Sequence, residues 1–358
     1  MALSSGSDLL KPGMESVVCD LCHSDQSEVV TRQRDLLLEV TNDEFTIVKC
    51  SRCGLVYLNP RPSKDLLGSY YPTVYYPPVQ TKVRPQLQQR AKKVSTQMKR
   101  WVLEDYYGYP STVSAGWSRI VRRILLWPDK TLRELKGRHP LPWRGEGKVL
   151  DVGCGAGGNL KTLQDQGWDP HGIEISEVAA AHARELVTGN IHTGTLESAP
   201  FPPKSFDLVF MSHSLEHLPS PVDALRRVHR LLKDDGFLVV SVPNVSSLEF
   251  KLFGRWWFPL DPPRHFYHFD KRSLSGIMAQ AGFRLHRVRT GISAIYLMAS
   301  LDRLWKHRFR KNVPFRKLID RLIARPLSLI AGHFGYGTEI TVYAIKQQDG
   351  VSTPPRAL

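Results

Sequence analysis

Three glycines in the middle of the chain have the spacing of a turn that binds a nucleotide. Gly153, Gly155 and Gly158 fit the pattern Gly-x-Gly-x-x-Gly and follow the apolar run Lys148–Val152. Glycines permit a tight turn and let a ligand approach the backbone, and the helix that follows presents unpaired N–H groups to it. The pattern alone does not distinguish a dinucleotide from another nucleoside ligand. A strand–turn–helix with purely structural glycines is the alternative.

Two carboxylates narrow the choice of ligand. Asp151 precedes the first glycine by two residues, where a negative charge suits a ligand ammonium and would sit poorly beside a pyrophosphate. Glu174 ends the next apolar run, 23 residues after Asp151, where an acid accepts hydrogen bonds from ribose hydroxyls. A proline-rich turn, Pro200–Ser205, then leads into a third apolar run. These features favour a nucleoside ligand with an ammonium group over a dinucleotide.

Four cysteines near the N-terminus predict a metal site. The pairs Cys19-x-x-Cys22 and Cys50-x-x-Cys53 are separated by 27 residues, and two such knuckles complete a tetrahedral four-cysteine site of the zinc-ribbon kind. Because the protein supplies all four ligands, we expect structural Zn2+ that contributes much of the stability of this short segment. The alternative is four unligated thiols, which a reducing compartment tolerates.

Candidate catalytic groups follow the third apolar run. His213 lies three residues before Glu216, so both side chains share one face of a helical turn. A carboxylate that orients a histidine raises its basicity, which predicts a general base. His217 comes next and is expected in the substrate pocket. In the alternative interpretation, Glu216 and His217 only cap and tether a loop.

A second polar stretch, Asp261–Phe269, combines two prolines with charged and aromatic side chains. Such a concentration after a predicted strand indicates a substrate pocket or its lid. We expect His265 to take part in catalysis and the others to line the pocket; these are Arg264, Tyr267 and His268. The alternative is a packed lid in which Arg264 pairs with a nearby acid.

Short apolar strands alternating with helical stretches position these groups, a pattern typical of an α/β doubly wound parallel sheet. We expect strands at Lys148–Val152, Pro170–Ile175, Phe206–Met211, Gly236–Val242, Arg284–Arg289 and Glu339–Lys346. The chain divides into a zinc-ribbon-like segment (1–63), a basic, partly helical connector (64–144), an α/β domain (145–347) with a basic helical insertion at about 290–335, and a flexible tail (348–358). Within the connector, residues 86–106 are expected to be helical.

The net charge of +15 lies in the flanks of the α/β domain. Residues 81–144 hold 15 Lys and Arg against 4 Asp and Glu, and residues 284–330 hold 12 against 2, whereas residues 145–283 hold 13 against 16. In the insertion, apolar residues at helical spacing alternate with Lys and Arg. This pattern suits a helix on an anionic membrane, or equally a helix packed on the domain with solvated charges. Nucleic acid is a further interpretation of the charge.

No run reaches the roughly 18 apolar residues that span a bilayer; the longest uncharged candidate, Thr290–Leu301, has 12 residues. The N-terminus is polar and lacks the apolar region of a signal peptide. We therefore expect a cytoplasmic protein, with the inner membrane surface as the place of any peripheral contact.

The glycine turn, Glu174, the proline-rich turn and Leu215-Glu216-His217 together resemble the class I S-adenosylmethionine-dependent methyltransferases, especially those that act on small molecules. The resemblance covers residues 149–283, with Glu339–Lys346 as the final antiparallel strand. It implies a Rossmann-like seven-stranded sheet with helices on both faces. It also implies S-adenosylmethionine as the cofactor, bound across the carboxyl ends of the first, second and fourth strands.

The resemblance also implies which residues bind the cofactor. The glycine turn would line the methionine end, Glu174 would hold the ribose, and Leu196 and Glu197 would lie near the adenine. The residues implied are Asp151, Gly153, Cys154, Gly155, Gly157, Glu174, Leu196, Glu197 and Ser212. Many relatives carry Asp where Thr195 stands here, which weakens the match near the adenine. Cys154 is expected to be a small residue of the turn and not a nucleophile.

Two further features are similar to known methyltransferases. Cysteine-knuckle N-termini followed by a stretch like Gly54–Pro62 precede many bacterial relatives. Methyltransferases that act on quinone precursors hold a metal with an acid, a Glu and a His at positions comparable to His213, Glu216 and His217. His213 departs from that set, so the resemblance gives little support to a catalytic metal.

These observations lead to three hypotheses. The first is methyl transfer to a small-molecule acceptor, including lipid- or saccharide-linked ones. The second is an RNA or protein methyltransferase that docks through its zinc ribbon and basic flanks. The third, a fold that binds cofactor or partner without catalysis, is disfavoured by the intact turn and Glu174.

Overall fold

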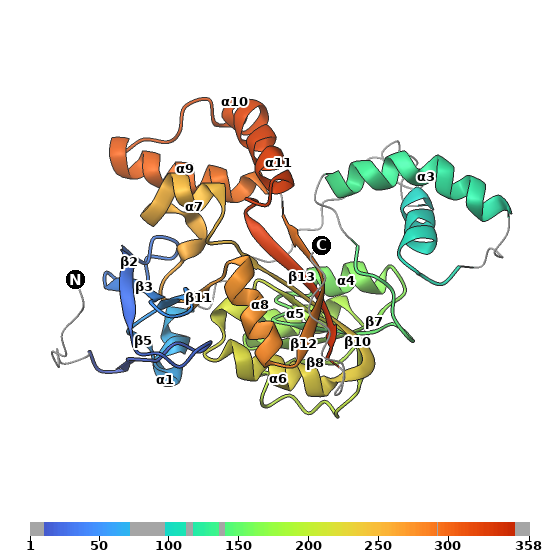
Figure 1. The fold of residues 1–358 in the computed structure, drawn as a ribbon, viewed down its shortest axis with the longest axis horizontal. Helices are drawn as coiled ribbons and strands as arrows, with labels where there is room; N and C mark the ends of the chain where they lie inside the picture. The colour runs from blue at the N-terminus through green and yellow to red at the C-terminus, as the bar shows by residue number, and fades with distance from the viewer. Residues whose placement is uncertain (1–10, 72–96, 112–116, 136–139, 292, 348–358) are drawn as a thin grey trace.

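The computed structural model describes residues 11–71, 97–111, 117–135, 140–291 and 293–347. A seven-stranded sheet lies at its centre (Figure 1). Its strands are β6 (Lys148–Val152), β7 (Asp169–Glu174), β8 (Ile191–Thr193), β9 (Phe206–Ser212), β10 (Leu232–Pro243), β12 (Phe283–Thr290) and β13 (Glu339–Lys346). Residues 86–96 of the predicted connector helix and the predicted flexible tail, residues 348–358, lie outside the described residues.

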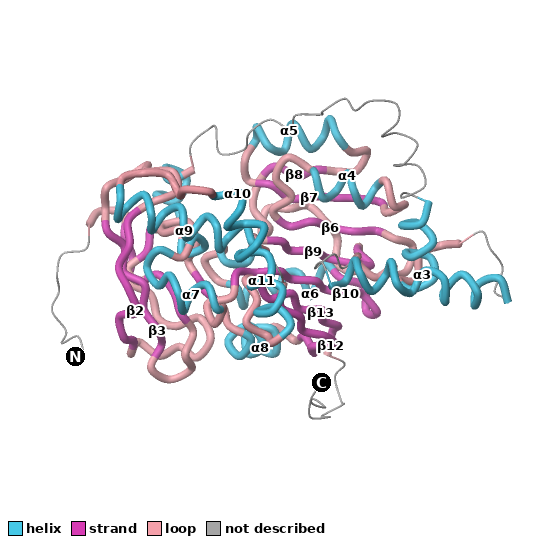
Figure 2. The backbone as a smooth tube through the Cα atoms, turned by 90° about the horizontal axis from the view of Figure 1, so that it is seen from above, coloured by secondary structure: helices cyan, strands magenta, loops and turns pink. Residues whose placement is uncertain are grey.

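The order of the strands is β12-β13-β10-β9-β6-β7-β8, and Figure 2 shows them as a ladder from β8 to β12. The strands from β10 to β8 pair in parallel, whereas β13 is antiparallel to both of its neighbours. The prediction of a Rossmann-like α/β sheet is confirmed, including its antiparallel last strand. Only β8, which has three residues, was not predicted.

Alternation of side chains along the strands divides the core between the two faces of the sheet. In β6, Leu150 belongs to a core cluster that includes side chains of α6 (Pro221–Leu231) and α8 (Lys271–Gln280). Its neighbour Val149 belongs to a second cluster that includes Leu163 of α4 and Leu103 of the helical residues 97–106. The remaining helices of the sheet are α4 (Gly158–Gln164) and α5 (Glu177–Leu186).

The N-terminal segment forms small sheets that join the α/β domain. Its elements are β1 (Met14–Glu15), β2 (Ser27–Arg34), β3 (Glu44–Cys50), β4 (Val56–Leu58), β5 (Arg61–Pro62), α1 (Lys64–Leu67) and η1 (Gly68–Tyr70). A four-stranded sheet, β11-β4-β3-β2, takes its strand β11 (Tyr267–His268) from the α/β domain. The cluster that holds Leu150 also holds Ile47 and Leu58, so the segment and the domain share one hydrophobic core.

Further helices, in addition to those named with the central sheet, lie along the upper side of the view in Figure 1. They are α3 (Trp117–Leu135), α7 (Leu248–Phe253), α9 (Ala294–Phe309), α10 (Arg316–Ile319), the π-helical turn η5 (Asp320–Ala324) and α11 (Arg325–His333). Short 3-10 turns complete the fold: η2 (Leu215–His217), η3 (Gly254–Trp256) and η4 (Phe258–Leu260). Among the described residues, no helix has the length and apolar character needed to cross a membrane.

Candidate functional site

The glycine turn after β6 is held in a conformation that only glycine adopts easily. Gly153 and Gly157 have φ angles of +79° and +81°, in the left-handed region that L side chains rarely adopt. A Cβ at Gly153 would lie 2.8 Å from Cβ of Ser214. The N–H groups of Gly153 and Cys154 both donate to the carbonyl of Ile173, at 2.8 and 3.1 Å. The turn is therefore tied to the end of β7.

Asp151 lies under this turn with its charge unpartnered. Its side chain is 1% exposed, and neither carboxylate oxygen has a hydrogen-bond partner among the described residues. Burial, with the charge of Glu174 adding to it, raises the pKa of Asp151 to about 7. A buried carboxylate without a donor is unfavourable unless a ligand supplies one. The ammonium of a methionine moiety fits that requirement.

Glu174 ends β7 beside the turn. One of its carboxylate oxygens accepts from the N–H of Gly155 at 2.8 Å, and the other accepts from the N–H of Ser176 at 2.9 Å. Each carboxylate oxygen has more than one acceptor site. Glu174 can therefore fix the turn and still accept hydrogen bonds from ribose hydroxyls.

The other predicted cofactor residues occupy different environments. The side chain of Cys154 is buried, and burial raises the pKa of its thiol well above the ordinary range, so the thiol is neutral and not a nucleophile. Leu196 is buried in the hydrophobic core, whereas Glu197 is exposed. Ser212 lies at the end of β9 and lines a cavity of about 300 Å³ together with Asn159 and Ser241. The structure thus brings Ser212, but not Glu197, to the lining of this cavity.

His213 lies between two glutamates. Its Nδ1 is 3.4 Å from Glu216 and its Nε2 is 3.4 Å from Glu339 at the start of β13. The hydroxyl of Tyr296 on α9 is also 3.4 Å from Nε2. Burial alone would lower the pKa of His213, but the two carboxylates raise it to about 10. His213 is therefore an imidazolium at neutral pH, which is the opposite of what the predicted general base needs.

Sequence reasoning missed Glu339 and Tyr296 as members of this cluster. Both come from segments far along the chain from His213, so no local spacing marks them. The one available signal was that Glu339 begins the predicted last strand. Because that strand is antiparallel, its first residue lies at the carboxyl edge of the parallel strands, beside Ser241.

A second cluster joins the two predicted acceptor stretches. Ligand-type atoms of Glu216, His217 and His265 all lie within 4.8 Å of one another. The Nδ1 atoms of His217 and His265 lie 3.1 and 2.7 Å from the carbonyls of Arg264 and Pro259. An N–H at each Nδ1 satisfies those carbonyls and leaves an unprotonated Nε2 on each ring.

The charge state of this cluster suits proton transfer or metal binding. Burial lowers the pKa of His217 to about 4, so its ring is neutral. Burial alone would raise the pKa of Glu216, but the positive charge of His213 lowers it to about 2, so its carboxylate is ionised. Apart from the ion pair with His213, neither Glu216 oxygen has a hydrogen-bond partner among the described residues. The two imidazoles of His217 and His265 and this carboxylate could orient a proton acceptor or hold a divalent cation.

The remaining residues of the second stretch lie deeper. Arg264 is 0% exposed, and its guanidinium donates to Asp35 and Asp261 with shortest distances of 2.6 Å to each. This geometry favours the alternative of a packed lid over a pocket-lining Arg264. Sequence analysis did not identify Asp35. Tyr267 donates to the carbonyl of Pro219 at 3.0 Å.

His268 is also buried. It is 1% exposed, and neither ring nitrogen has a hydrogen-bond partner among the described residues. Burial lowers the pKa of His268 to about 3, so the ring is neutral. Its ring centroid lies 6.3 Å from that of His265. His268 therefore lies in the core next to the cluster of Glu216, His217 and His265.

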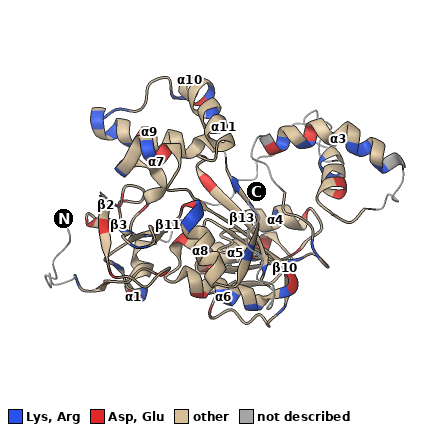
Figure 3. Cartoon of the chain, in the orientation of Figure 1, with Lys and Arg blue, Asp and Glu red and all other residues tan. Residues whose placement is uncertain are grey.

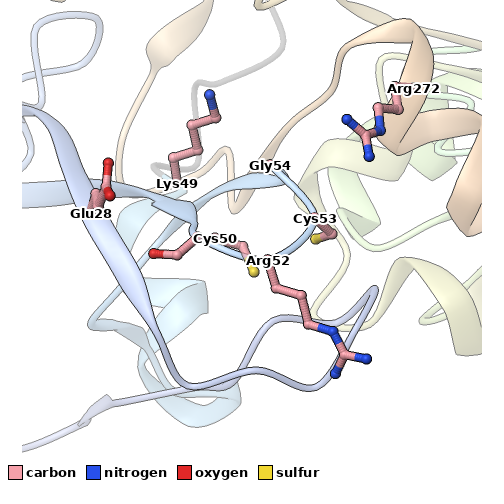
Figure 4. A pocket seen from close by; sticks show the side chains of 8 residues that line it. Glu28, Lys49, Cys50, Arg52, Cys53, Gly54 and Arg272 are labelled. Atoms are coloured by element: carbon pink, nitrogen blue, oxygen red, sulfur yellow. The ribbon is translucent and has the colours of Figure 1, made fainter.

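The four cysteines meet at one point between β2, β3 and β4. Their Sγ atoms all lie within 4.8 Å of one another, and the closest pairs, Cys19–Cys53 and Cys22–Cys50, are 3.4 Å apart. Tetrahedral Zn–S bonds of about 2.3 Å place sulfurs roughly 3.8 Å apart, so the donor set fits Zn2+. Figure 4 shows Cys50 and Cys53 with Lys49, Arg52 and Arg272 nearby.

Backbone donors favour the thiolate form, which a metal requires, at Cys50, whereas burial raises the pKa of Cys19 and Cys53. Burial alone would raise the pKa of Cys50, but the N–H groups of Cys53 and Arg52 lower it to about 7. Each knuckle also closes with a backbone bond, from His23 to Cys19 at 2.8 Å and from Gly54 to Cys50 at 3.0 Å. The chain therefore presents a preformed set of four sulfur ligands.

Residues 112–288 match the family described as a methyltransferase domain. This match covers the glycine turn, the strand that ends in Glu174 and both polar clusters except Tyr296 and Glu339. Residues 112–288 therefore form a methyltransferase domain. The predicted resemblance is thereby confirmed, and the family supports S-adenosylmethionine as the cofactor of the turn at Asp151.

Curated relatives match this chain over part of their length. An uncharacterized methyltransferase of Bacillus subtilis, YcgJ, is 38% identical over 105 residues, which are 27% of this chain and 42% of that protein. The ubiquinone biosynthesis O-methyltransferase of Aliivibrio fischeri is 31% identical over 115 residues, 30% of this chain and 49% of that enzyme. The malonyl-[acyl-carrier protein] O-methyltransferase of Enterobacter lignolyticus is 28% identical over 146 residues, which are 39% of this chain and 57% of that enzyme. The chain thus spans about half the length of the curated relatives it matches.

Solved structures include an S-adenosylmethionine-dependent methyltransferase of Thermotoga maritima, described as a possible histamine N-methyltransferase. It aligns with a TM-score of 0.41 and 19% identity over 72% of this chain and 98% of that one.

Proposed function

We propose that the protein transfers a methyl group from S-adenosylmethionine to a small-molecule acceptor, lipid- or saccharide-linked acceptors included. The single observation that carries the proposal is the buried, unpartnered carboxylate of Asp151 beneath the glycine turn. The partial relatives named for ubiquinone biosynthesis and for malonyl-[acyl-carrier protein] act on small or carrier-linked acceptors, which supports this substrate class.

In this proposal the cofactor's sulfonium supplies the methyl group, and the residues of this chain position the acceptor and take its proton. Asp151 holds the ammonium and Glu174 the ribose. His265 accepts the acceptor's proton at Nε2, because its Nδ1 is committed to the carbonyl of Pro259 at 2.7 Å. The ionised Glu216 beside it stabilises the imidazolium that forms.

The neighbouring charges support this division of roles. His213 is already protonated, so it stabilises the negative charge of Glu216 and does not compete for the proton. His217 stays neutral and positions the loop through its contacts with the hydroxyl of Tyr71 at 3.0 Å and the carbonyl of Arg264. A divalent cation held by Glu216, His217 and His265 is the competing use of the same atoms.

The activity is tested by incubating the protein and radiolabelled methyl donor with cell extract, then separating lipid, small-molecule, RNA and protein fractions. The proposal expects label in the small-molecule or lipid fraction, and loss of that label with the His265→Ala variant. Label confined to RNA or protein would contradict the acceptor class. Abolition of labelling by a chelator that leaves the cysteine site loaded would assign the cluster to a cation.

We further propose that the four cysteines hold a structural Zn2+. With all ligands supplied by protein, the ion would have no open position and would serve stability only. Metal analysis should give one zinc per chain, and the Cys22→Ser variant should lose zinc and unfold at lower temperature. A protein that contains no zinc and has an unchanged unfolding midpoint in Cys22→Ser would contradict this role.

A further inference from the structure

α3 exposes its apolar face to solvent, which an ordinary surface helix does not do. A helix of a soluble protein buries its apolar face and exposes its charged one. On α3, Ile124, Leu125 and Trp127 are 68%, 73% and 60% exposed. The other exposed apolar residues of the helix are Ile120, Val121 and Leu132. At 100° per residue all six fall within one half of the helix, so they form one outward apolar face.

The charged face of α3 is directed toward the protein. Arg122 donates to Asp105 at 2.6 and 2.7 Å, and Arg119 donates to the same carboxylate at 3.2 Å. Asp105 and its neighbour Glu104 are both buried. Ion pairs with the helical residues 97–106 thus fix the orientation of α3 and leave its apolar face exposed.

A second exposed apolar surface lies on α10, η5 and α11. Phe315, Leu322 and Phe334 are 80%, 64% and 70% exposed. Further exposed apolar residues there are Leu318, Ile323, Leu329 and Ile330. The surrounding sequence is strongly basic, because residues 303–325 hold nine Lys and Arg against one Asp. Figure 3 shows Lys and Arg on both α3 and the α9–α11 region.

The helices that carry these two surfaces lie on the same side of the molecule. In Figure 1 the α9–α11 helices and α3 are separate elements along its upper side, and Figure 2, seen from above, shows both of them. A flat partner on that side could contact both at once. The same side reaches the acceptor cluster, by which we mean the polar side chains of His213, Glu216, His217, His265 and Glu339. The connection is α9, which carries Tyr296, whose hydroxyl is 3.4 Å from His213.

We propose that α3 and the α10–η5–α11 segment form one membrane-docking surface that binds an anionic lipid bilayer. Exposed apolar side chains of both elements would enter the boundary between headgroups and acyl chains, and the exposed Lys and Arg among residues 303–325 would pair with lipid phosphates. An RNA partner would leave the apolar faces unused. A second copy of the chain would place these basic surfaces opposite each other, which like-charge repulsion disfavours.

The proposal is tested by sedimentation of the full chain with vesicles. The wild-type protein should pellet with mixed phosphatidylcholine–phosphatidylglycerol vesicles, less so with added salt, and poorly with pure phosphatidylcholine. Double variants Ile124→Glu/Leu125→Glu and Leu322→Glu/Ile323→Glu should each lower the partition coefficient by about tenfold or more. The control Val29→Glu changes an exposed residue of β2, outside both surfaces, and should bind like wild type.

A second measurement does not depend on the folding of the Glu variants. The fluorescence of Trp127, taken as the difference between wild type and Trp127→Phe, should shift to shorter wavelength on adding anionic vesicles. Absence of binding to anionic vesicles would overturn the proposal. So would Glu variants that fold and bind as wild type does, or sedimentation equilibrium showing a dimer that the same substitutions dissociate.

Discussion

The cofactor turn and the acceptor cluster are neighbours at the carboxyl edge of the sheet, but they are built in different ways. One continuous stretch, residues 151–174, makes the cofactor turn, and it leaves the carboxylate of Asp151 without a partner among the described residues. The acceptor cluster joins distant segments and supplies its own counter-charges, with His213 between Glu216 and Glu339. The first region therefore leaves a carboxylate for a ligand to pair, whereas the second pairs its charged side chains with one another.

Replacing the proposed base should give the largest effect on turnover. The His265→Ala variant should lose about 100- to 10,000-fold in kcat, the range for removal of a general base. Its affinity for S-adenosylmethionine should not change, because the cofactor turn lies in the other region. Steady-state kinetics measure the loss in kcat, and calorimetry measures the affinity for S-adenosylmethionine. An equal loss of cofactor affinity would show that the regions are not independent.

Breaking the buried ion pair behind the acceptor cluster should act on stability. Arg264→Ala leaves Asp35 and Asp261 buried without their cation, which should lower the free energy of unfolding by about 3–5 kcal/mol. Urea unfolding measures the change. The control Arg226→Ala removes an exposed pair with Asp223 and should cost about 1 kcal/mol or less. Equal effects of the two variants would show that the buried pair does not join the N-terminal segment to the domain.

The charge of His213 should depend on pH in a defined direction. Because its folded pKa is raised to about 10, above the ordinary value of about 6.5, its stabilising contribution is complete below pH 6.5. That contribution is lost as the pH rises through 10. Glu339→Gln should lower the pKa of His213, as followed by NMR of the imidazole, while Glu197→Gln, a change at an exposed residue, should not. An imidazole that titrates near 6.5 in wild type would contradict the assigned cation.

The affinity of the cofactor turn for S-adenosylmethionine should depend on pH in the opposite direction and increase as the pH rises. The pKa of Asp151 is raised to about 7 in the protein without ligand, and an ammonium ligand needs the ionised carboxylate. S-adenosylmethionine affinity should therefore weaken as the pH falls below 7. Calorimetry in buffers of different ionisation enthalpy should detect proton release on binding near pH 6. Binding that is independent of pH between 5 and 8 would exclude Asp151 as the partner of the ammonium.

The sequence predicted the cofactor region because its determinants are local. The glycine spacing, Asp151 and the end of β7 all lie within a run of 24 residues, and the strands there have clear apolar cores. The acceptor region was predicted only in part. The side chains at 213–217 and 261–268 were found by their composition, but Glu339 and Tyr296 reach His213 from far along the chain.

The protonation of His213 could not be inferred either, because spacing shows only one of its two carboxylates. Similarly, nothing in the sequence indicates that Arg264 pairs with Asp35 across 229 residues, or that β11 adds a strand to the N-terminal sheet. The helical character of the basic insertion follows from its periodicity, but the outward direction of the apolar face of α3 does not. That direction depends on which face finds ion-pair partners in the folded chain.

The central claim is tested most directly by titrating the protein with S-adenosylmethionine, and separately with NAD, by calorimetry at pH 8. Wild type should bind S-adenosylmethionine and not NAD. Asp151→Asn should bind it about 10- to 100-fold more weakly, the cost of losing one hydrogen bond to a charged group. Asp169→Asn, at the opposite end of β7, should bind as wild type does. Binding of NAD alone, or equal affinity in wild type and Asp151→Asn, would contradict the account.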